Sequence, residues 1–273
     1  MRDNEHILKY YRPPNGSFKQ CFASVLGLHN ETINIHSHLL GSLLFFSLPA
    51  WTYTTVFKEY PSTNYYDMAV FSTFYFGVAI CFLLSSSFHV INCHSQRINV
   101  FGNQLDYLGI VLLMWGATIP SVYYGFHDIV KLRNIYWTVV SVLGGLCCAA
   151  SVHPKFRTPA LRPYRSAMYA CLGLSGLVFM THCVVIYGFA EANRRMSLDW
   201  MGLMGLFNML GAVAYGARIP ERLSPGKFDL YGSSHQILHV AVIFAGLAHM
   251  FGVLRAFRYY HNTFPTLFRA SAL

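Results

Sequence analysis

The chain is poor in charged residues. Asp, Glu, Lys and Arg make up 11% of its 273 residues and hydrophobic residues 54%, whereas charged residues are about 25% of an ordinary soluble domain. Long apolar stretches recur along almost the whole length instead. The sequence therefore predicts an integral membrane protein. The net charge of +9 is scattered over short loops, which argues against a nucleic-acid partner.

Three further features are missing. Residues 1–30 lack the apolar core of a cleavable signal peptide, so we expect the first span to direct insertion. The seven cysteines are odd in number and include no Cys-x-x-Cys pair, which favours packing thiols over a disulfide framework. The apolar stretches do not alternate with polar residues as the strands of a membrane β-barrel do. A helical bundle is therefore the simplest arrangement.

Seven apolar windows reach about 20 residues, the length that a helix needs to cross the hydrocarbon core. They cover residues 35–57, 67–91, 105–126, 135–151, 166–189, 198–217 and 235–257, and the fourth is the shortest. We predict an all-α membrane protein with a seven-transmembrane-helix bundle at 35–257, a polar N-terminal segment at 1–34 and a C-terminal tail at 258–273. The glycines Gly173, Gly176, Gly202 and Gly205 predict close helix contacts in the fifth and sixth spans.

Lysines and arginines are divided unequally between the two sides that seven spans define. The side of the N-terminus has twelve, namely Arg2, Lys9, Arg12, Lys19, Arg97, Lys155, Arg157, Arg162, Arg165, Arg218, Arg222 and Lys227. The opposite side has eight, namely Lys58, Lys131, Arg133, Arg194, Arg195, Arg255, Arg258 and Arg269. The positive-inside rule then predicts a cytoplasmic N-terminus and an extracytoplasmic C-terminus. Such a protein belongs in the plasma membrane or an endomembrane.

The most informative motif is the pair His235 and His239, one helical turn apart at the start of the last span. Residues i and i+4 share one face of a helix. Imidazoles are costly in hydrocarbon and need partners there, and a metal ion suits this pair. Odd spans start and even spans end on one side of the membrane. Ser85 and His89 near the end of the second span, and Asp106 at the start of the third, should therefore lie within roughly 10 Å of the same face.

This group of side chains predicts a zinc site. His89, His235 and His239 can supply three imidazole nitrogens, and three histidines with an open fourth position are typical of catalytic zinc. Asp106 would complete the metal sphere or act as general base for a zinc-bound water, whose pKa falls to about 7. Ser85 would orient His89 or donate to an oxyanion. Haem with two axial histidines is the alternative, although it leaves a third histidine and a carboxylate without a role.

Further polar residues enter the first span on this face, namely Glu31, Asn34, His36 and His38. We interpret Glu31 as a helix-capping residue or as a partner of a metal ligand. His182 and His249 lie apart from the group. We interpret both as hydrogen bonders between helices, because His249 is ten residues beyond His239 and off its face.

Four segments also carry a family resemblance. They are ETINIHSHLLG at 31–41, FHVINCHS at 88–95, LDYLGI at 105–110, and IPERLSPGKFD at 219–229 running into SHQILH at 234–239. In this order they resemble the progestin and adipoQ receptor family, and the last is similar to its adiponectin-receptor branch. The pattern of Ser85, His89, Asp106 and the His235–His239 pair also resembles the wider superfamily of alkaline ceramidases and haemolysin-III-like proteins.

The resemblance implies more than the spacing does. It implies Zn²⁺ held by the three histidines, Asp106 beside a zinc-bound water, and a lipid cavity open to the bilayer. It also implies hydrolysis of the amide bond of ceramide to a sphingoid base and a fatty acid. Tyr107 and Arg165 match positions that face the lipid head group or the fatty-acid carboxylate in adiponectin receptors. Family members act as receptors or as regulators of lipid and metal homeostasis.

Two functions from different classes are therefore expected. The first is a zinc-dependent membrane amide hydrolase of the ceramidase type, with ceramide and fatty acid as its lipid partners and a link to lipid and metal signalling. The alternative is a membrane receptor with a purely structural zinc, which binds an extracellular protein ligand and signals through its cytoplasmic face. A redox or transport protein is a third class, which haem absorbance would reveal.

Overall fold

The computed structural model describes residues 4–153 and 161–264, apart from the side chains of Arg162, Pro163, Arg165 and Ser166. Every regular element in these two ranges is helical. The α-helices are α1 (Phe18–Ala23), α2 (Thr32–Trp51), α3 (Tyr65–Ile91), α4 (Gln96–Gly125), α5 (Val130–Val152), α6 (Arg162–Tyr187), α7 (Phe189–Met196), α8 (Leu198–Ala217) and α9 (Ser234–Thr263). A 3₁₀ turn, η1 (Ser24–Leu26), follows α1, and a π turn, η2 (Thr52–Val56), and a 3₁₀ turn, η3 (Phe57–Glu59), extend α2.

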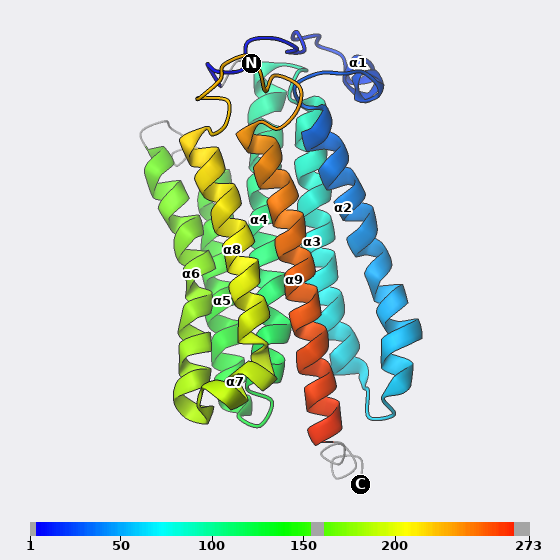
Figure 1. Cartoon of the computed structure of the whole chain (residues 1–273), viewed down its shortest axis with the longest axis vertical. Coiled ribbons are helices and arrows are strands. Elements are labelled where there is room, and N and C mark those ends of the chain that lie inside the picture. Colours follow the sequence, from blue (N-terminus) through cyan, green and yellow to red (C-terminus); the bar gives the residue numbers. More distant parts are fainter. Residues whose placement is uncertain (1–3, 154–160, 265–273) are drawn as a thin grey trace.

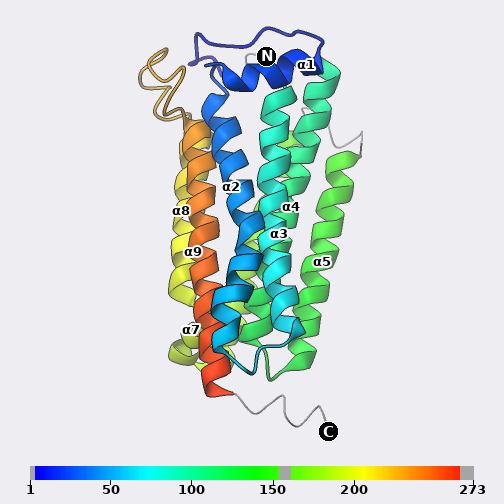
Figure 2. The same ribbon diagram turned by 90° about the vertical axis from the view of Figure 1, so that its right-hand side faces the viewer.

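Seven long helices run side by side along the long axis of the molecule (Figure 1), and the same bundle is seen after a quarter turn (Figure 2). Each of the seven is long and apolar enough to cross a membrane. Helix α1 lies across one end of the bundle, which we call the N-terminal end, and α7 lies at the other, the C-terminal end. The prediction of an all-α, seven-span, multi-pass membrane protein is thus confirmed.

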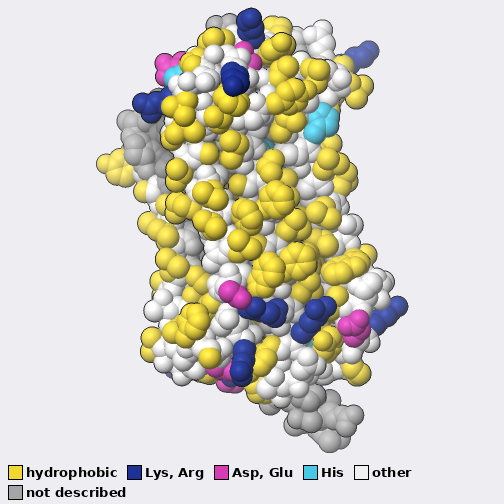
Figure 3. Space-filling view, viewed as in Figure 1, with side chains coloured by type: hydrophobic (Ala, Val, Ile, Leu, Met, Phe, Trp, Pro, Cys, Tyr) yellow, Lys and Arg dark blue, Asp and Glu magenta, His cyan; other side chains and the backbone are white. Residues whose placement is uncertain are grey.

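The surface agrees with a hydrocarbon environment. Hydrophobic side chains cover the middle of the face in Figure 3, and lysines and arginines gather toward both ends. Large apolar side chains such as Leu174, Leu206 and Val213 are more than half exposed. A soluble domain would bury such residues, whereas lipid tails solvate them.

Helix ends differ from the predicted spans where capping residues decide them. Helix α4 begins at Gln96 rather than at 105, because the Ser95 hydroxyl accepts the backbone N–H of Ile98 at 3.4 Å. Helix α9 continues to Thr263, beyond residue 257. The fourth span was predicted to be the shortest, but α5 has 23 residues and α8 has 20.

Close helix contact lies elsewhere than predicted. A Cβ atom on Gly77 of α3 would lie 2.8 Å from the carbonyl oxygen of Leu112, and one on Gly116 of α4 would lie 2.7 Å from that of Thr73. Only glycine therefore permits the packing of α3 on α4 at the centre of the bundle. The prediction for Gly202 and Gly205 was wrong, since no described atom lies within 4 Å of a Cβ built on either. Gly173 makes ordinary contact with Met114 of α4, and Gly176 approaches only Phe179 of its own helix. The close approach of α8 is at Gly211, where a Cβ would lie 3.0 Å from Cδ1 of Leu238 on α9.

Residues 4–30, which we call the N-terminal strap, cross the N-terminal end of the bundle. The Asp229 carboxylate, between α8 and α9, accepts the backbone N–H groups of Leu8 at 2.9 Å and Lys9 at 3.0 Å. The Arg12 guanidinium donates to the carbonyl oxygens of His89 and Val90 at the end of α3. These bonds satisfy carbonyls that the helix end would otherwise leave unpaired. The strap therefore closes the bundle over the end at which the predicted site lies.

Candidate metal centre

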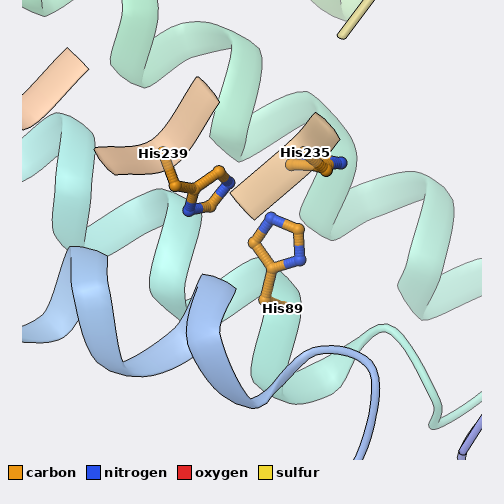
Figure 4. A group of neighbouring side chains, drawn as sticks. All are labelled: His89, His235 and His239. Carbon is orange, nitrogen blue, oxygen red and sulfur yellow. The ribbon is translucent and has the colours of Figure 1, made fainter. Parts of the chain in front are cut away.

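Three histidines meet near the N-terminal end of the bundle. His89 comes from the last turn of α3, and His235 and His239 come from the first two turns of α9. Figure 4 shows their imidazoles gathered around one point. One ring nitrogen of each lies within 4.8 Å of the corresponding atoms of the other two. His89 and His239 are buried, and His235 is half-buried.

A carboxylate fixes the orientation of His89. Its Nδ1 lies 2.8 Å from Oε2 of Glu31, so Nδ1–H donates and the lone pair is left on Nε2. That Nε2 atom is buried and has no hydrogen-bond partner among the described residues. Glu31 also accepts the side-chain amides of Asn34 at 2.6 Å and Asn92 at 3.2 Å. Burial alone would raise the pKa of Glu31, but the neighbouring His89 lowers it well below its usual range.

His239 has the same arrangement with a backbone acceptor. Its Nδ1 lies 3.2 Å from the carbonyl oxygen of Asn34, so Nε2 is left to face the cluster. Metal-binding histidines commonly donate their second ring nitrogen to a carboxylate or carbonyl in this way. Three imidazoles placed in this way could hold a metal ion. The sequence led us to interpret Glu31 as a helix-capping residue or as a partner of a metal ligand. Glu31 makes no side-chain capping bond, and its carboxylate holds His89 instead.

Asp106 and Ser85 lie beside the three histidines. The Asp106 carboxylate on α4 interacts with the Ser85 hydroxyl and with His89 on α3. Among the described residues the close ligand group contains the histidines alone. The carboxylate of Asp106 is therefore not one of the closely grouped ligand atoms, and its role as a base stays a prediction. Ser85 is buried and lies next to Asp106.

A fourth imidazole adjoins the group. The ring of His38 on α2 stacks between His239, at a centroid distance of 3.7 Å, and Phe82, at 4.6 Å. His38 was expected on this face, but its stacking against His239 was not. His36 is turned elsewhere, with Nδ1 2.8 Å from the carbonyl oxygen of Thr32. The spacing of two residues in a helix separates their faces by about 200°.

The remaining predicted residues are Tyr107, Arg165, His182 and His249. Tyr107 stacks on Tyr169 of α6 at 5.4 Å. The side chain of Arg165 lies outside the described residues. The interpretation of His182 and His249 is confirmed, because His182 Nδ1 lies 2.6 Å from the Tyr136 hydroxyl on α5 and His249 Nε2 lies 2.9 Å from a carbonyl oxygen of α4.

Comparison with known proteins shows the family of the chain. Residues 26–250 match the model of the haemolysin-III-related family. The chain belongs to this family. Its resemblance to progestin and adipoQ receptors is also confirmed by relatives that match over most of the chain.

Three relatives from different organisms show how similar this haemolysin-III-related chain is to known proteins. An adiponectin receptor protein of Drosophila melanogaster is 40% identical over 255 residues, which are 93% of this chain and 56% of the relative. The ADIPOR-like receptor IZH2 of Saccharomyces cerevisiae is 38% identical over 96% of this chain and 82% of the relative. Heptahelical transmembrane protein 1 of Arabidopsis thaliana is 34% identical over 91% and 76%. The chain thus spans little more than half of the fly relative.

Proposed function

We propose that this adiponectin-receptor-like protein is a zinc-dependent membrane amide hydrolase that converts ceramide-type lipids to sphingoid base and fatty acid. The observation that carries the proposal is the group of three imidazole nitrogens, within 4.8 Å of one another, with His89 held by Glu31. Zinc sites of catalytic type use three protein ligands and keep one position for water or substrate. A purely structural zinc usually has four protein ligands.

His89, His235 and His239 would hold the zinc. When bound, zinc supplies Lewis-acid polarisation of the amide carbonyl and a water of lowered pKa. The Asp106 carboxylate would accept the proton of the attacking water and pass it to the leaving amine nitrogen. Ser85 would hold that carboxylate in place through its hydroxyl. Tyr107 and Arg165 would contact the lipid head group or the fatty-acid carboxylate.

The orientation is part of the proposal. Twelve of the twenty lysines and arginines fall on the side of the N-terminus, which supports a cytoplasmic N-terminus and an extracytoplasmic C-terminus. The histidine group would then lie near the cytoplasmic leaflet, and ceramide would enter sideways from the bilayer. Protease protection of tags placed at either end of the chain in sealed vesicles tests this orientation.

The first experiment is metal analysis of detergent-purified protein. Wild type should carry about one zinc per chain, and His235→Ala should carry almost none. His182→Ala is the matched control, because this histidine bonds Tyr136 between two helices and should not affect the zinc content. Equal zinc in wild type and His235→Ala would rule out the site.

The second experiment separates catalysis from metal binding. Asp106→Asn keeps the shape of the side chain and removes the base, so it should keep zinc and lose release of fatty acid from labelled ceramide. Unchanged hydrolysis by Asp106→Asn contradicts the assigned base. Wild type that holds zinc but releases no fatty acid contradicts the hydrolase.

A receptor with a structural zinc is the second candidate. It is supported by the relatives in fly and yeast, whose names describe them as receptors. An extracellular protein ligand would bind at the C-terminal end, and the signal would pass to the strap and the histidine group. In this case chelation would abolish the response to the ligand, while no lipid product would be lost.

A further inference from the structure

Two thiols meet under the N-terminal strap. The Sγ atoms of Cys21 and Cys93 lie 3.5 Å apart, although the residues are 72 positions apart in the chain. Cys21 is on α1 of the strap, and Cys93 follows the last turn of α3. Both side chains are buried and both cysteines are free. No other two cysteines in the described ranges have sulfur atoms in such contact.

The surrounding contacts hold the two sulfurs in register. The Cys21 thiol donates to Oδ1 of Asn15 at 3.4 Å, and Nδ2 of Asn15 donates to the Cys93 sulfur at 3.8 Å. The backbone N–H of Asn15 donates to the carbonyl oxygen of Cys93 at 3.1 Å, and that of Gly16 to His94 at 3.0 Å. The strap is therefore fastened to the end of α3 on the side of the thiol pair.

Helix α1 buries one residue, and that residue is Cys21. Its neighbours Phe18, Lys19, Gln20 and Phe22 are exposed, so the thiol lies beneath a single layer of structure. Burial raises the pKa of the Cys21 thiol, as does Cys93, and this slows its reaction as a thiolate. A local opening of the strap gives a small oxidant access to both sulfurs.

We propose that Cys21 and Cys93 form a reversible disulfide when the protein meets an oxidant of the peroxide class. One sulfur attacks a peroxide oxygen and becomes a sulfenic acid as the first water leaves. The second thiol attacks that sulfur, the S–S bond forms and the second water leaves. Two thiols are oxidised by two electrons, and one peroxide is reduced to two waters. The S–S bond of about 2.05 Å requires the sulfurs to approach by roughly 1.5 Å.

The bond would link oxidation to the histidine group. Cys93 directly follows Asn92, whose side-chain amide donates to Glu31, and Glu31 holds His89. Arg12 of the strap binds the carbonyl oxygens of His89 and Val90. A covalent bond between strap and α3 therefore fixes the strap over the histidines. The proposal does not depend on the hydrolase or on a bound metal.

The test uses the whole wild-type chain in detergent. The reduced protein is treated with hydrogen peroxide or diamide, remaining thiols are blocked with N-ethylmaleimide, and digested peptides are mapped by mass spectrometry without reduction. We expect two of the seven thiols to escape blocking, and a Cys21–Cys93 peptide pair that dithiothreitol separates. Cys21→Ser and Cys93→Ser should each lose the crosslink, and Cys147→Ser, another buried thiol, should keep it.

A second readout reports on the strap. Amide hydrogen exchange of residues 4–30 should slow about tenfold on oxidation of wild type and stay unchanged in Cys21→Ser. Added glutathione shows in the same tube that the oxidant is active. The proposal is overturned if glutathione is fully oxidised while Cys21 and Cys93 both still react with N-ethylmaleimide. It is also overturned if either cysteine pairs with another cysteine of the chain.

Discussion

The two ends of the bundle each contain buried histidine, but its partners differ. At the C-terminal end, His261 Nδ1 lies 2.6 Å from the Ser62 hydroxyl, and Nε2 lies 3.2 Å from Asp67 Oδ2. At the N-terminal end, the Nε2 atom of His89 is buried with no hydrogen-bond partner among the described residues. The ends therefore differ in how histidines are grouped: three imidazole nitrogens lie within 4.8 Å of one another at the N-terminal end, whereas His261 lies between a hydroxyl and a carboxylate.

The C-terminal group behaves as a structural network. The Asp67 carboxylate is fully buried and accepts the Tyr124 hydroxyl at 2.8 Å and the backbone N–H of Asn64 at 3.0 Å. Asp67 thereby completes a capping box for α3 and joins α3 to α4 and α9. These contacts fix the packing of three helices, and they do not include three grouped metal-ligand atoms. A buried histidine alone therefore does not identify a ligand site, whereas the convergence of three imidazole nitrogens does.

Removal of metal should have the largest effect, and at one end only. With zinc a thousandfold above its Kd, binding stabilises the folded state by about 4 kcal/mol. Chelation should then lower the Tm of wild type by about 8–16 °C. His235→Ala should show no chelator response, whereas His261→Ala should keep it. The measurement is thermal unfolding in detergent with and without chelator, and a wild-type Tm that ignores chelation would break the comparison.

Loss of the Asp67 carboxylate should be next. Asp67→Ala removes one partner of a buried ion pair and leaves His261, Tyr124 and the Asn64 N–H unsatisfied, which costs about 3 kcal/mol. Zinc content should stay at the wild-type level, because the histidine group lies at the opposite end. Denaturant unfolding and metal analysis of one preparation check both. Tyr124→Phe is the graded control and should cost about 1 kcal/mol; loss of zinc from Asp67→Ala would contradict independent ends.

Glu31 tests the N-terminal end more finely. Glu31→Ala removes the acceptor that orients His89, and loss of such an outer partner should weaken zinc binding by about 10–100-fold. Competition with a fluorescent zinc chelator measures the affinity. Asp229→Ala is the matched control, because Asp229 also accepts two N–H groups at this end but holds the strap rather than a histidine. Similar losses in both variants would assign Glu31 a merely structural role.

Much of the bundle follows from composition and periodicity. Seven apolar windows predict seven helices, and alternation of the spans puts His89 and the His235–His239 pair at one end, where the structure has them. The i, i+4 pair fixes its own geometry, because both residues share a helix face.

Other parts depend on contacts that no window reveals. The start of α4 is decided by the Ser95 cap, and the closest helix approach by Gly77 and Gly116, whose partners are backbone atoms of other residues. From the sequence, Arg12 was only one of the positive charges on the side of the N-terminus, yet its guanidinium binds the end of α3. Cys21 and Cys93 are 72 residues apart, and only folding of the strap brings them together.

Acidification should have the smallest effect on stability, and it should act at both ends of the bundle. Burial would raise the pKa of Glu221, but hydrogen bonds from Ser234 and Asn4 help to lower it below its usual value. At the other end, burial likewise opposes and Tyr187 and Arg195 lower the pKa of Asp128. A carboxylate with a depressed folded pKa stabilises the protein above its unfolded pKa of about 4. That stabilisation is lost as pH falls through the folded pKa.

The Tm difference between wild type and Glu221→Gln should therefore be constant from about pH 7 to 5 and shrink below about pH 4. Asp128→Asn should follow the same course with a smaller difference, because the Asp128 side chain is 41% exposed whereas Glu221 is fully buried. A difference that grows on acidification would reverse the assigned direction of both shifts.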